Sequence, residues 1–486
     1  MLTRDEFQTI YEQGPDAVYA VVATLQQQVT SLTALVADLQ TQVQQLKARL
    51  DTDSHNSNKP PSSDWLKKPR TTSQRKPSPR KPGGQKGHPG RHLQFTHAPD
   101  KVIEHTPTYC TGCGSDLADV ASVTVQARQV VDLPPLNLLV TQHRAHTCVC
   151  PDCGHINHAA FPEGVTAHVQ YGPRVQALSV YLSTYHLLPY ARIRQVFADL
   201  FGARLSTATV FSAVQSAHSR LKDVVQEIKT ALTTASVAHF DESGCRVAGQ
   251  LHWWHVASTH TLTFYRFHRS RGKIGMDAAG VLPGFRGRAV HDGWSSYQHY
   301  GCAHSLCNAH HLRELTAVFE QDGQLWAQKM HALLVEIYQS VERAKREKRL
   351  RVPVLLEVRF EARYRRLLAE GFAANPPPEP VVGQKGRCKQ SKARNLLDRL
   401  ERFQPEVLAF LYDFSVPFDN NQAERDIRML KLKQKVSGCF RVAEGAEAFC
   451  TIRSYLSTLH KQGQSLWSAL EHVFRGAVLR PDLAVG

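Results

Sequence analysis

The chain has 486 residues, of which 59 are Lys or Arg and 43 are Asp or Glu, so its formal net charge is +16. This length allows several domains with separate cores, and the basic excess favours a polyanionic partner such as nucleic acid. Eleven cysteines in so long a chain exclude a disulfide-rich secreted scaffold, and without a signal peptide or an apolar run of transmembrane length we expect a cytoplasmic protein outside the membrane.

A heptad repeat runs through residues 18–50. Its a positions are Val22, Val29, Val36, Val43 and Leu50, and its d positions are Leu25, Leu32, Leu39 and Leu46. β-Branched residues at a with Leu at d favour a parallel two-stranded coiled coil. We therefore predict that residues 1–50 form a dimerisation helix. The alternative is one amphipathic helix that packs on its own chain.

Residues 51–99 are expected to form a basic, Pro-rich arm. Between Lys59 and Arg91 there are ten Lys or Arg residues and a single acid, Asp64. Seven prolines in this segment, among Gly and Ser, argue against a buried core. The charge suits contacts with DNA phosphates, for which we single out Lys81 and Lys86. An inert solvated linker is the alternative.

Two CxxC pairs predict a zinc-binding domain over residues 100–165. The four cysteines are Cys110, Cys113, Cys150 and Cys153, and 36 residues separate the two pairs. Four thiolates complete a tetrahedral structural site for one Zn²⁺. Strand-like segments at 123–131 and 138–148 are expected to pair as a hairpin between them. Cys148 is an alternative ligand, but its CxC spacing suits the site less well.

Residues 166–234 are expected to be a helical domain, because apolar residues recur there at spacings of three and four. Ser206 offers an N-cap, and the helix that follows it would be a recognition helix if this segment were a helix-turn-helix. That signal is weak, and plain helical packing is the favoured interpretation.

Alternating apolar residues then predict an antiparallel meander of three strands, at 237–241, 250–257 and 262–268. Asp241 is expected to end the first and central strand, with Glu242 facing the opposite side. Asp292 ends a further strand-like run at 287–291.

A third acid, Glu424, lies at a predicted helix start, where Asn421 as N-cap and Glu424 three residues later would form a capping box. Three carboxylates on one point suit two Mg²⁺ or Mn²⁺ ions. Two such ions promote in-line displacement at phosphorus. For each acid alone, a solvated strand end or a helix cap is the alternative.

Cys307 and His310 follow another strand-like run at 302–307. Metal binding by this pair would need two more ligands, so the more modest hypothesis is that His310 lies near the acids and orients a phosphate or a water molecule. A histidine satisfied within the core is equally compatible with the sequence. Residues from about 315 to 413 are expected to be a helical insertion.

Basic residues follow Glu424 within about three helical turns, and they are expected to lie along a DNA backbone. Those that we single out are Arg425, Arg428, Lys431 and Lys433. A solvated basic face is the alternative.

Three segments carry a specific resemblance. HFDESGCRVAG, VHDGWSSYQHYGCAHSLCNAHHLREL and DNNQAERDIRMLKLKQKVSGCFR resemble the signature blocks of the IS66-family insertion-sequence transposases. The arm segments 58–64 and 83–88 and the CxxC pairs resemble the same family, so the resemblance covers nearly the whole chain. It implies an RNase H-like DDE core over residues 235–443, with Asp241, Asp292 and Glu424 as its acids, followed by a helical tail over 444–486.

The resemblance also implies an α+β multidomain enzyme of the bacterial cytoplasm, associated with the nucleoid. Such an enzyme cleaves DNA at the ends of its element and transfers the freed 3′-hydroxyl into target DNA, in a dimer or higher oligomer. It implies accessory proteins encoded by the same element. Two other hypotheses are a non-catalytic DNA-binding regulator of transposition and an RNase H-like structure-specific nuclease.

Overall fold

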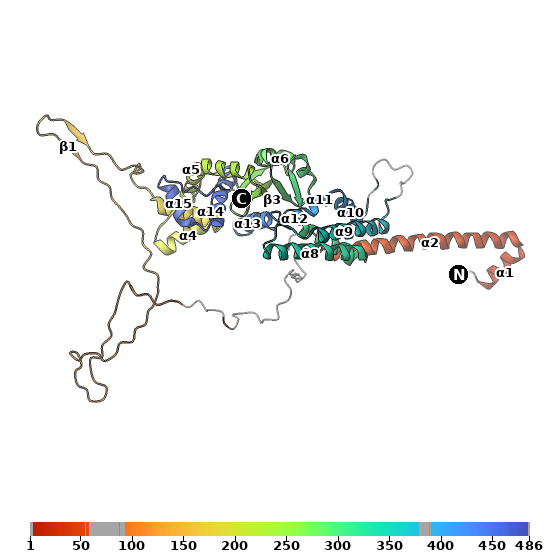
Figure 1. Cartoon of the computed structure of the whole chain (residues 1–486), viewed down its shortest axis with the longest axis horizontal. Coiled ribbons are helices and arrows are strands. Elements are labelled where there is room, and N and C mark those ends of the chain that lie inside the picture. The colour runs from red at the N-terminus through yellow and green to blue at the C-terminus, as the bar shows by residue number, and fades with distance from the viewer. Residues whose placement is uncertain are drawn as a thin grey trace. The chain divides into compact units, whose positions relative to one another are not determined.

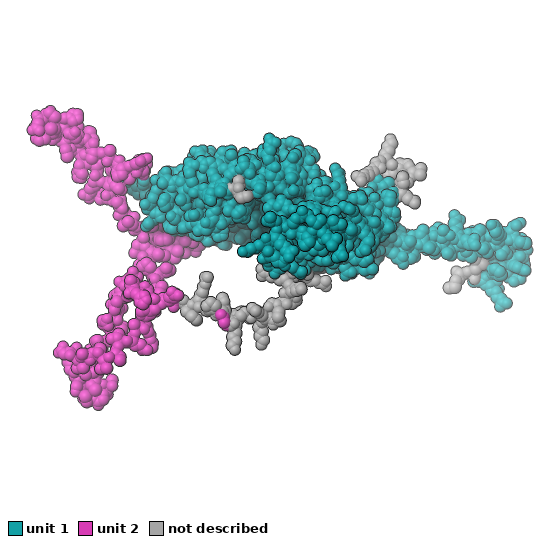
Figure 2. Space-filling model, in the orientation of Figure 1, with its two compact units in different colours: residues 1–70, 167–193, 206–486 teal, residues 71–166, 194–205 magenta. Residues whose placement is uncertain are grey.

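The computed structural model describes residues 3–53, 55–57, 87, 93–378, 388 and 390–484. The chain divides into two units, which Figure 2 shows in different colours. The larger unit comprises residues 1–70, 167–193 and 206–486, and the smaller comprises residues 71–166 and 194–205. Many helices together with one mixed sheet confirm the predicted α+β class.

Five strands form the sheet of the larger unit (Figure 1). They are β3 (Val237–Val247), β4 (Gln250–Ser258), β5 (Thr263–His268), β6 (Arg288–His291) and β7 (Ala303–Leu306). Their order is β5-β4-β3-β6-β7, in which β3, β4 and β5 are antiparallel neighbours and β6 and β7 run parallel to β3. The predicted meander and the central position of its first strand are confirmed.

The first strand is longer than predicted. Asp241 pairs with Val256 in the middle of β3, so the prediction that it ends the strand is wrong. The strand continues because Cys245 and Val247 are buried in an apolar cluster with residues of β4 and β5. A two-residue turn at Ala248 and Gly249, with φ values of 49° and 76°, then returns the chain in register.

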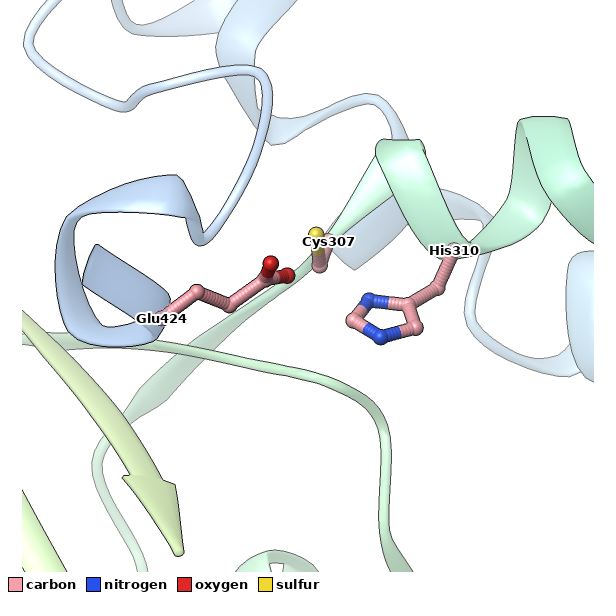
Figure 3. A group of neighbouring side chains, drawn as sticks. All are labelled: Cys307, His310 and Glu424. Carbon is pink, nitrogen blue, oxygen red and sulfur yellow. The ribbon is translucent and has the colours of Figure 1, made fainter. Parts of the chain in front are cut away.

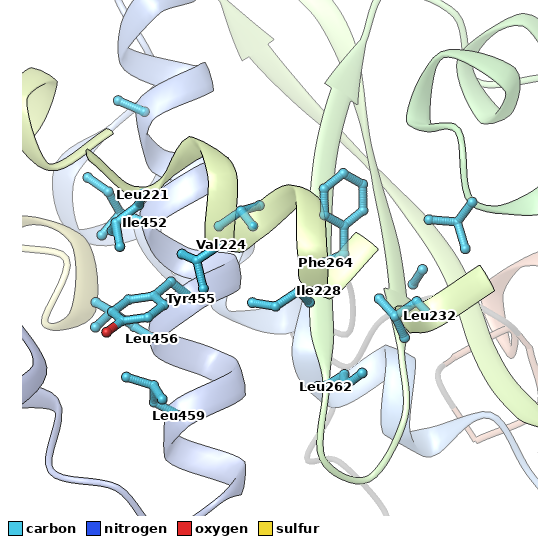
Figure 4. Packing of buried hydrophobic residues seen from close by; sticks show 14 of the residues in the cluster. Leu221, Val224, Ile228, Leu232, Leu262, Phe264, Ile452, Tyr455, Leu456 and Leu459 are labelled. Carbon is cyan, nitrogen blue, oxygen red and sulfur yellow. The ribbon is translucent and has the colours of Figure 1, made fainter. Parts of the chain in front are cut away.

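Helices cover both faces of the sheet. On one face, α5 (Thr207–Thr233) and α14 (Ala443–Lys461) pack on Phe240 and Phe264, as Figure 4 shows for part of this cluster. On the other face, α13 (Asn421–Ser437) packs on β3 and β4 through an apolar cluster that includes Trp254. The sheet is therefore a central layer, and α13 lies on the face to which Asp241 points.

The segment before the sheet is helical, as predicted. It contains α3 (Pro173–Val180), a π-helical turn (Tyr181–Tyr185), α4 (Tyr190–Phe201) and α5. Ser206 caps α5 by accepting a 3.0 Å hydrogen bond from the amide of Thr209. The inner face of α5 is buried in the core, which supports plain helical packing. Downstream, α15 (Leu466–Phe474) completes the helical tail.

Shorter elements connect the strands. Between β5 and β6 lie α6 (Lys273–Ala279) and a 3₁₀ turn (Leu282–Gly284), and another 3₁₀ turn (Ser295–His299) precedes β7.

The predicted insertion between β7 and α13 is helical and has a core of its own. Its helices are α7 (Asn308–Asp322), α8 (Leu325–Arg346), α9 (Val354–Ala374), α10 (Lys392–Arg402), α11 (Gln404–Val407) and α12 (Ala409–Tyr412). Met330, Tyr364 and Leu397 are fully buried within it. The last predicted helix is divided because Phe403 leaves the helical conformation and Pro405 starts a new turn.

Two helices, α1 (Arg4–Glu12) and α2 (Pro15–Leu50), begin the chain. The a and d side chains of the heptad are 45–73% exposed in α2, so nothing within this chain covers them. One window of α2 reaches a mean hydropathy of 1.2, which suffices in length and composition for a membrane span. The apolar residues follow a heptad, however, and this distribution favours a coiled-coil seam.

The smaller unit has little regular structure. Its strands β1 (Thr147–Val149) and β2 (Ile156–His158) are antiparallel, and residues 119–146 contain no strand. The predicted hairpin of 123–131 with 138–148 is therefore wrong. Its apolar residues are exposed, including Val123 and Leu139. A small zinc domain obtains much of its folding free energy from the metal, so this peptide gives strands little support. Lys81 and Lys86 lie outside the described residues.

Candidate active site

The sheet brings two of the predicted acids to one level. β3 and β6 are parallel and His239 is opposite Val290 in their register. Asp241 and Asp292 each follow two residues later, so they lie beside each other where the two strands separate. Glu424, in the first turn of α13, reaches the same region from the helix that covers this face.

The three acids influence one another's charge. Burial raises the pKa of the Asp241 carboxyl well above its usual range, and the charges of Glu242, Asp292 and Glu424 raise it further. A 2.8 Å hydrogen bond from the amide of Glu242 to Asp241 Oδ1 only partly opposes this shift. Buried carboxylates that repel one another in this way favour the binding of a cation.

Glu424 carries an unsatisfied oxygen. Arg428 Nη2 lies 3.3 Å from Glu424 Oε2, but this guanidinium is largely exposed and the ion pair is weak. The other oxygen, Oε1, is buried without a hydrogen-bond partner. Buried polar atoms are seldom left unpaired, so this oxygen points to a ligand.

Asn420 fixes the start of α13. Its Nδ2 donates to the carbonyl of Phe240 at 2.7 Å, its Oδ1 lies 2.9 Å from His239 Nδ1, and its amide donates to Cys307 Sγ at 3.1 Å. Asn420, not Asn421, is the N-cap residue, and its side chain makes no capping hydrogen bond. The predicted capping box is therefore wrong, because the Asn420 side chain binds β3 instead.

A chain of histidines holds the turn at Asp292. The amide of Gly293 donates to His291 Nδ1 at 3.0 Å, which places the His291 proton on Nε2. That proton is donated to His304 Nδ1 at 3.0 Å, and His304 Nε2 donates to the carbonyl of Tyr300. Gly293 has a φ of 87°, which suits glycine. The amide of Trp294 then donates to Asp292 Oδ1 at 2.9 Å.

Glu242 lies on the opposite face of β3 from Asp241, as predicted, but its surroundings are not those of a spectator. Arg271 Nη2 and Nε lie 2.8 and 3.0 Å from its Oε1, and the Tyr297 hydroxyl donates to Oε2 at 2.6 Å. Burial, together with the charge of Asp292, raises the pKa of Glu242 to about 7. No local pattern in the sequence indicates this ion pair, and Glu242 is unsuitable as a neutral control.

His310 lies in the first turn of α7, beside Glu424, as Figure 3 shows. Its Nδ1 is buried and has no hydrogen-bond partner, which argues against a histidine satisfied within the core. The nearness of His310 to the acids thus agrees with the sequence-based hypothesis.

The basic residues of α13 divide into two groups. Arg425, Arg428 and Lys431 are exposed along the helix. Lys433 is buried, lies 3.8 Å from the centre of the Phe440 ring, and donates to the carbonyl of Gly438. Lys433 therefore cannot contact a DNA phosphate in this conformation, and its inclusion among the DNA-binding residues is wrong.

The two CxxC pairs have the same local geometry. The amide of Cys110 donates to the carbonyl of Ser115, and the amide of Gly114 donates back to the carbonyl of Cys110. Cys150, Gly154 and His155 repeat both hydrogen bonds. The two turns do not converge, because no cluster of close metal-ligating atoms among the described residues includes these cysteines.

Comparisons with known protein families agree with these observations. Residues 107–154, which span both CxxC pairs, match the zinc-finger binding domain of transposase IS66, and this match supports a structural Zn²⁺. Residues 12–94 match a family of unknown function (DUF6444). No curated protein matches the chain. Residues 168–448, more than half of the chain and all three acids, match the Transposase IS66 family. The chain therefore belongs to the IS66 family of transposases.

Proposed function

We propose that this transposase cleaves DNA strands at the ends of its element and joins the freed 3′-hydroxyl to target DNA at a site formed by Asp241, Asp292 and Glu424. The observation that carries the proposal is the common level of Asp241 and Asp292 on neighbouring parallel strands, with Glu424 added from α13. Acids from three separate segments lie together, and a solvated strand end or helix cap does not require this.

The sheet supports an RNase H-like core. Three antiparallel strands are followed by two strands that extend the sheet in parallel beside the first, in the order β5-β4-β3-β6-β7. The helical insertion then separates the last strand from the helix that carries Glu424.

Mg²⁺ or Mn²⁺ fits the residues present. Asp241, Asp292 and Glu424 offer hard carboxylate oxygens, and Glu424 Oε1 has no other partner. When bound, two such ions would stabilise the attacking and leaving oxygens of a displacement at phosphorus. The protein's own contribution is to hold the carboxylates: Asn420 fixes the Glu424 helix, and the Trp294 amide orients Asp292.

DNA binding, which the family implies, is assigned to two surfaces. The exposed side chains of Arg425, Arg428 and Lys431 are suited to contacts with the phosphate backbone beside the acids. The basic arm, including Lys81 and Lys86, would add contacts that do not depend on sequence. The zinc domain would recognise element ends in the cytoplasm, a coil of α2 helices would pair two transposases, and accessory proteins of the element would complete the assembly.

The test is incubation of the purified protein with Mg²⁺ and supercoiled DNA that carries the element's ends. Asp241→Asn and Asp292→Asn should each abolish cleavage and joining while DNA binding persists, because the amide keeps the shape but loses the anionic ligand. Mn²⁺ should replace Mg²⁺, and Ca²⁺ should not.

Asp223→Asn is the matched control, since Asp223 is exposed on α5 and should be dispensable. Near-normal activity of Asp292→Asn would show that the site is misassigned. Cleavage without joining would indicate a structure-specific nuclease, and binding without cleavage would indicate a regulator.

A further inference from the structure

Cys307, His310 and Glu424 form a compact group of potential metal ligands. One ligand atom from each residue lies within 4.8 Å of the other two, and no other such group occurs in the described part of the chain. Cys307 connects β7 to α7, and the other two residues lie in the first turns of α7 and α13. Figure 3 shows the Glu424 carboxylate and the His310 imidazole approaching Cys307 from opposite sides.

Two of the three side chains have unmet hydrogen-bonding capacity at this point. His310 Nδ1 and Glu424 Oε1 are buried and have no partner, although buried polar atoms are normally paired. The third side chain is prepared for a metal in another way. The backbone amide of Asn420 donates to Cys307 Sγ at 3.1 Å, and such a bond stabilises a thiolate.

We propose that Cys307, His310 and Glu424 bind one divalent transition-metal ion of borderline softness, of which Zn²⁺ is the type. Sulfur, imidazole nitrogen and carboxylate oxygen are the usual ligands of Zn²⁺, whereas Mg²⁺ prefers oxygen alone. Three protein ligands leave a fourth position for water or a phosphate oxygen. The thiol of Cys307 would release its proton to solvent as the sulfur binds the ion.

The proposed zinc ion would compete with the catalytic ions for Glu424. This consequence rests on the proposed function, in which Glu424 is one of the three acids. Zinc at this position would draw the carboxylate toward α7, away from Asp241 and Asp292. Zn²⁺ would then inhibit strand cleavage that is supported by Mg²⁺.

Zinc content of the full-length protein tests the site without any assay of activity. After saturation with Zn²⁺ and removal of the excess, the wild-type chain should retain two ions, one in the zinc domain and one at Cys307. Cys307→Ser and His310→Gln should each retain one. Cys302→Ser, a change to the half-buried cysteine just before β7, is the matched control and should retain two.

Cobalt substitution gives a second readout, because a thiolate bound to Co²⁺ produces an intense charge-transfer absorption. The contribution of the second ion to this absorption should disappear in Cys307→Ser and persist in Asp292→Asn, since Asp292 is not a proposed ligand. One retained ion in the wild-type chain would overturn the proposal. So would a second ion that depends on Asp292 and not on Cys307. Should Cys307→Ser fail to fold, His310→Gln decides by the same two measurements.

Inhibition forms a separate arm. Added Zn²⁺ should slow Mg²⁺-supported cleavage by the wild-type protein and by Cys302→Ser, and should slow it much less in Cys307→Ser. Absence of any cleavage would count against the proposed function alone, because the zinc count would still decide the metal site. A second ion that leaves cleavage unaffected would overturn the competition.

Discussion

At the scale of single residues, the functional acids and the residues that hold them differ in how visible they are in sequence. Asp241, Asp292 and Glu424 stand in recognisable motifs, so they could be singled out before the structure. Asn420 could not be assigned its part, because its partners on β3 and at Cys307 are more than a hundred residues away along the chain. The same holds for Arg271, which binds Glu242 across the sheet.

Asn420 offers a direct test of this arrangement. Asn420→Ala removes the hydrogen bonds to Phe240 and His239 and should destabilise the larger unit by about 1–3 kcal/mol, because buried polar groups lose their partner. Chemical unfolding followed by tryptophan fluorescence measures this loss. Asn395→Ala, a change at an exposed position of α10, should alter stability by less than about 0.5 kcal/mol. Equal stability of both variants would contradict the assigned role of Asn420.

The basic residues of α13 can be separated in the same way. Replacing Arg425 and Lys431 with Gln should reduce the salt dependence of DNA binding by about 0.9 log units for each phosphate that the variant no longer neutralises. Lys433→Gln should leave that dependence unchanged, because Lys433 is buried against Phe440. Fluorescence anisotropy with labelled DNA at several salt concentrations provides the measurement. A similar decrease for Lys433→Gln would mean that this lysine reaches DNA after all.

At the scale of elements, local patterns predicted most strands and helices to within a few residues. The errors occurred where distant contacts decide the outcome. β3 passes Asp241 because Val247 finds a buried place near Phe440, whose backbone pairs with the turn at Ala248. The hairpin of the zinc domain failed for the opposite reason, since apolar alternation without a core to bury it does not stabilise strands.

Helix α2 carries a prediction at this scale. If two copies pair through the heptad, then Leu32→Glu with Leu39→Glu would bury charge in the seam and should convert the full-length protein from dimer to monomer. Light scattering gives the mass directly. Gln27→Glu with Thr41→Glu adds the same charge on the outer f positions and should leave the dimer intact. A wild-type protein that is already monomeric at high concentration would exclude the coil.

At the scale of the whole molecule, positive charge is concentrated away from the sheet. The segment from Lys59 to Arg91 has nine net positive charges in a chain whose total is +16. Deleting this segment should weaken DNA binding and flatten its salt dependence by about 0.9 log units for each phosphate released. A replacement of equal length built from Gly and Ser keeps the spacing and serves as the control for tethering. If that replacement restores the salt dependence, the arm is only a connection.

The insertion has ends that meet. The amide of Asn308, its first residue, donates to the carbonyl of Phe418 at 3.1 Å, and Cys307 meets the amide of Asn420 beside it. About a hundred residues thus leave the sheet and return to their starting point, with a separate core between. Such an excursion is a detachable module: its length and sequence are free to diverge among relatives, or to be exchanged for a graft, without moving the carboxylate of Glu424.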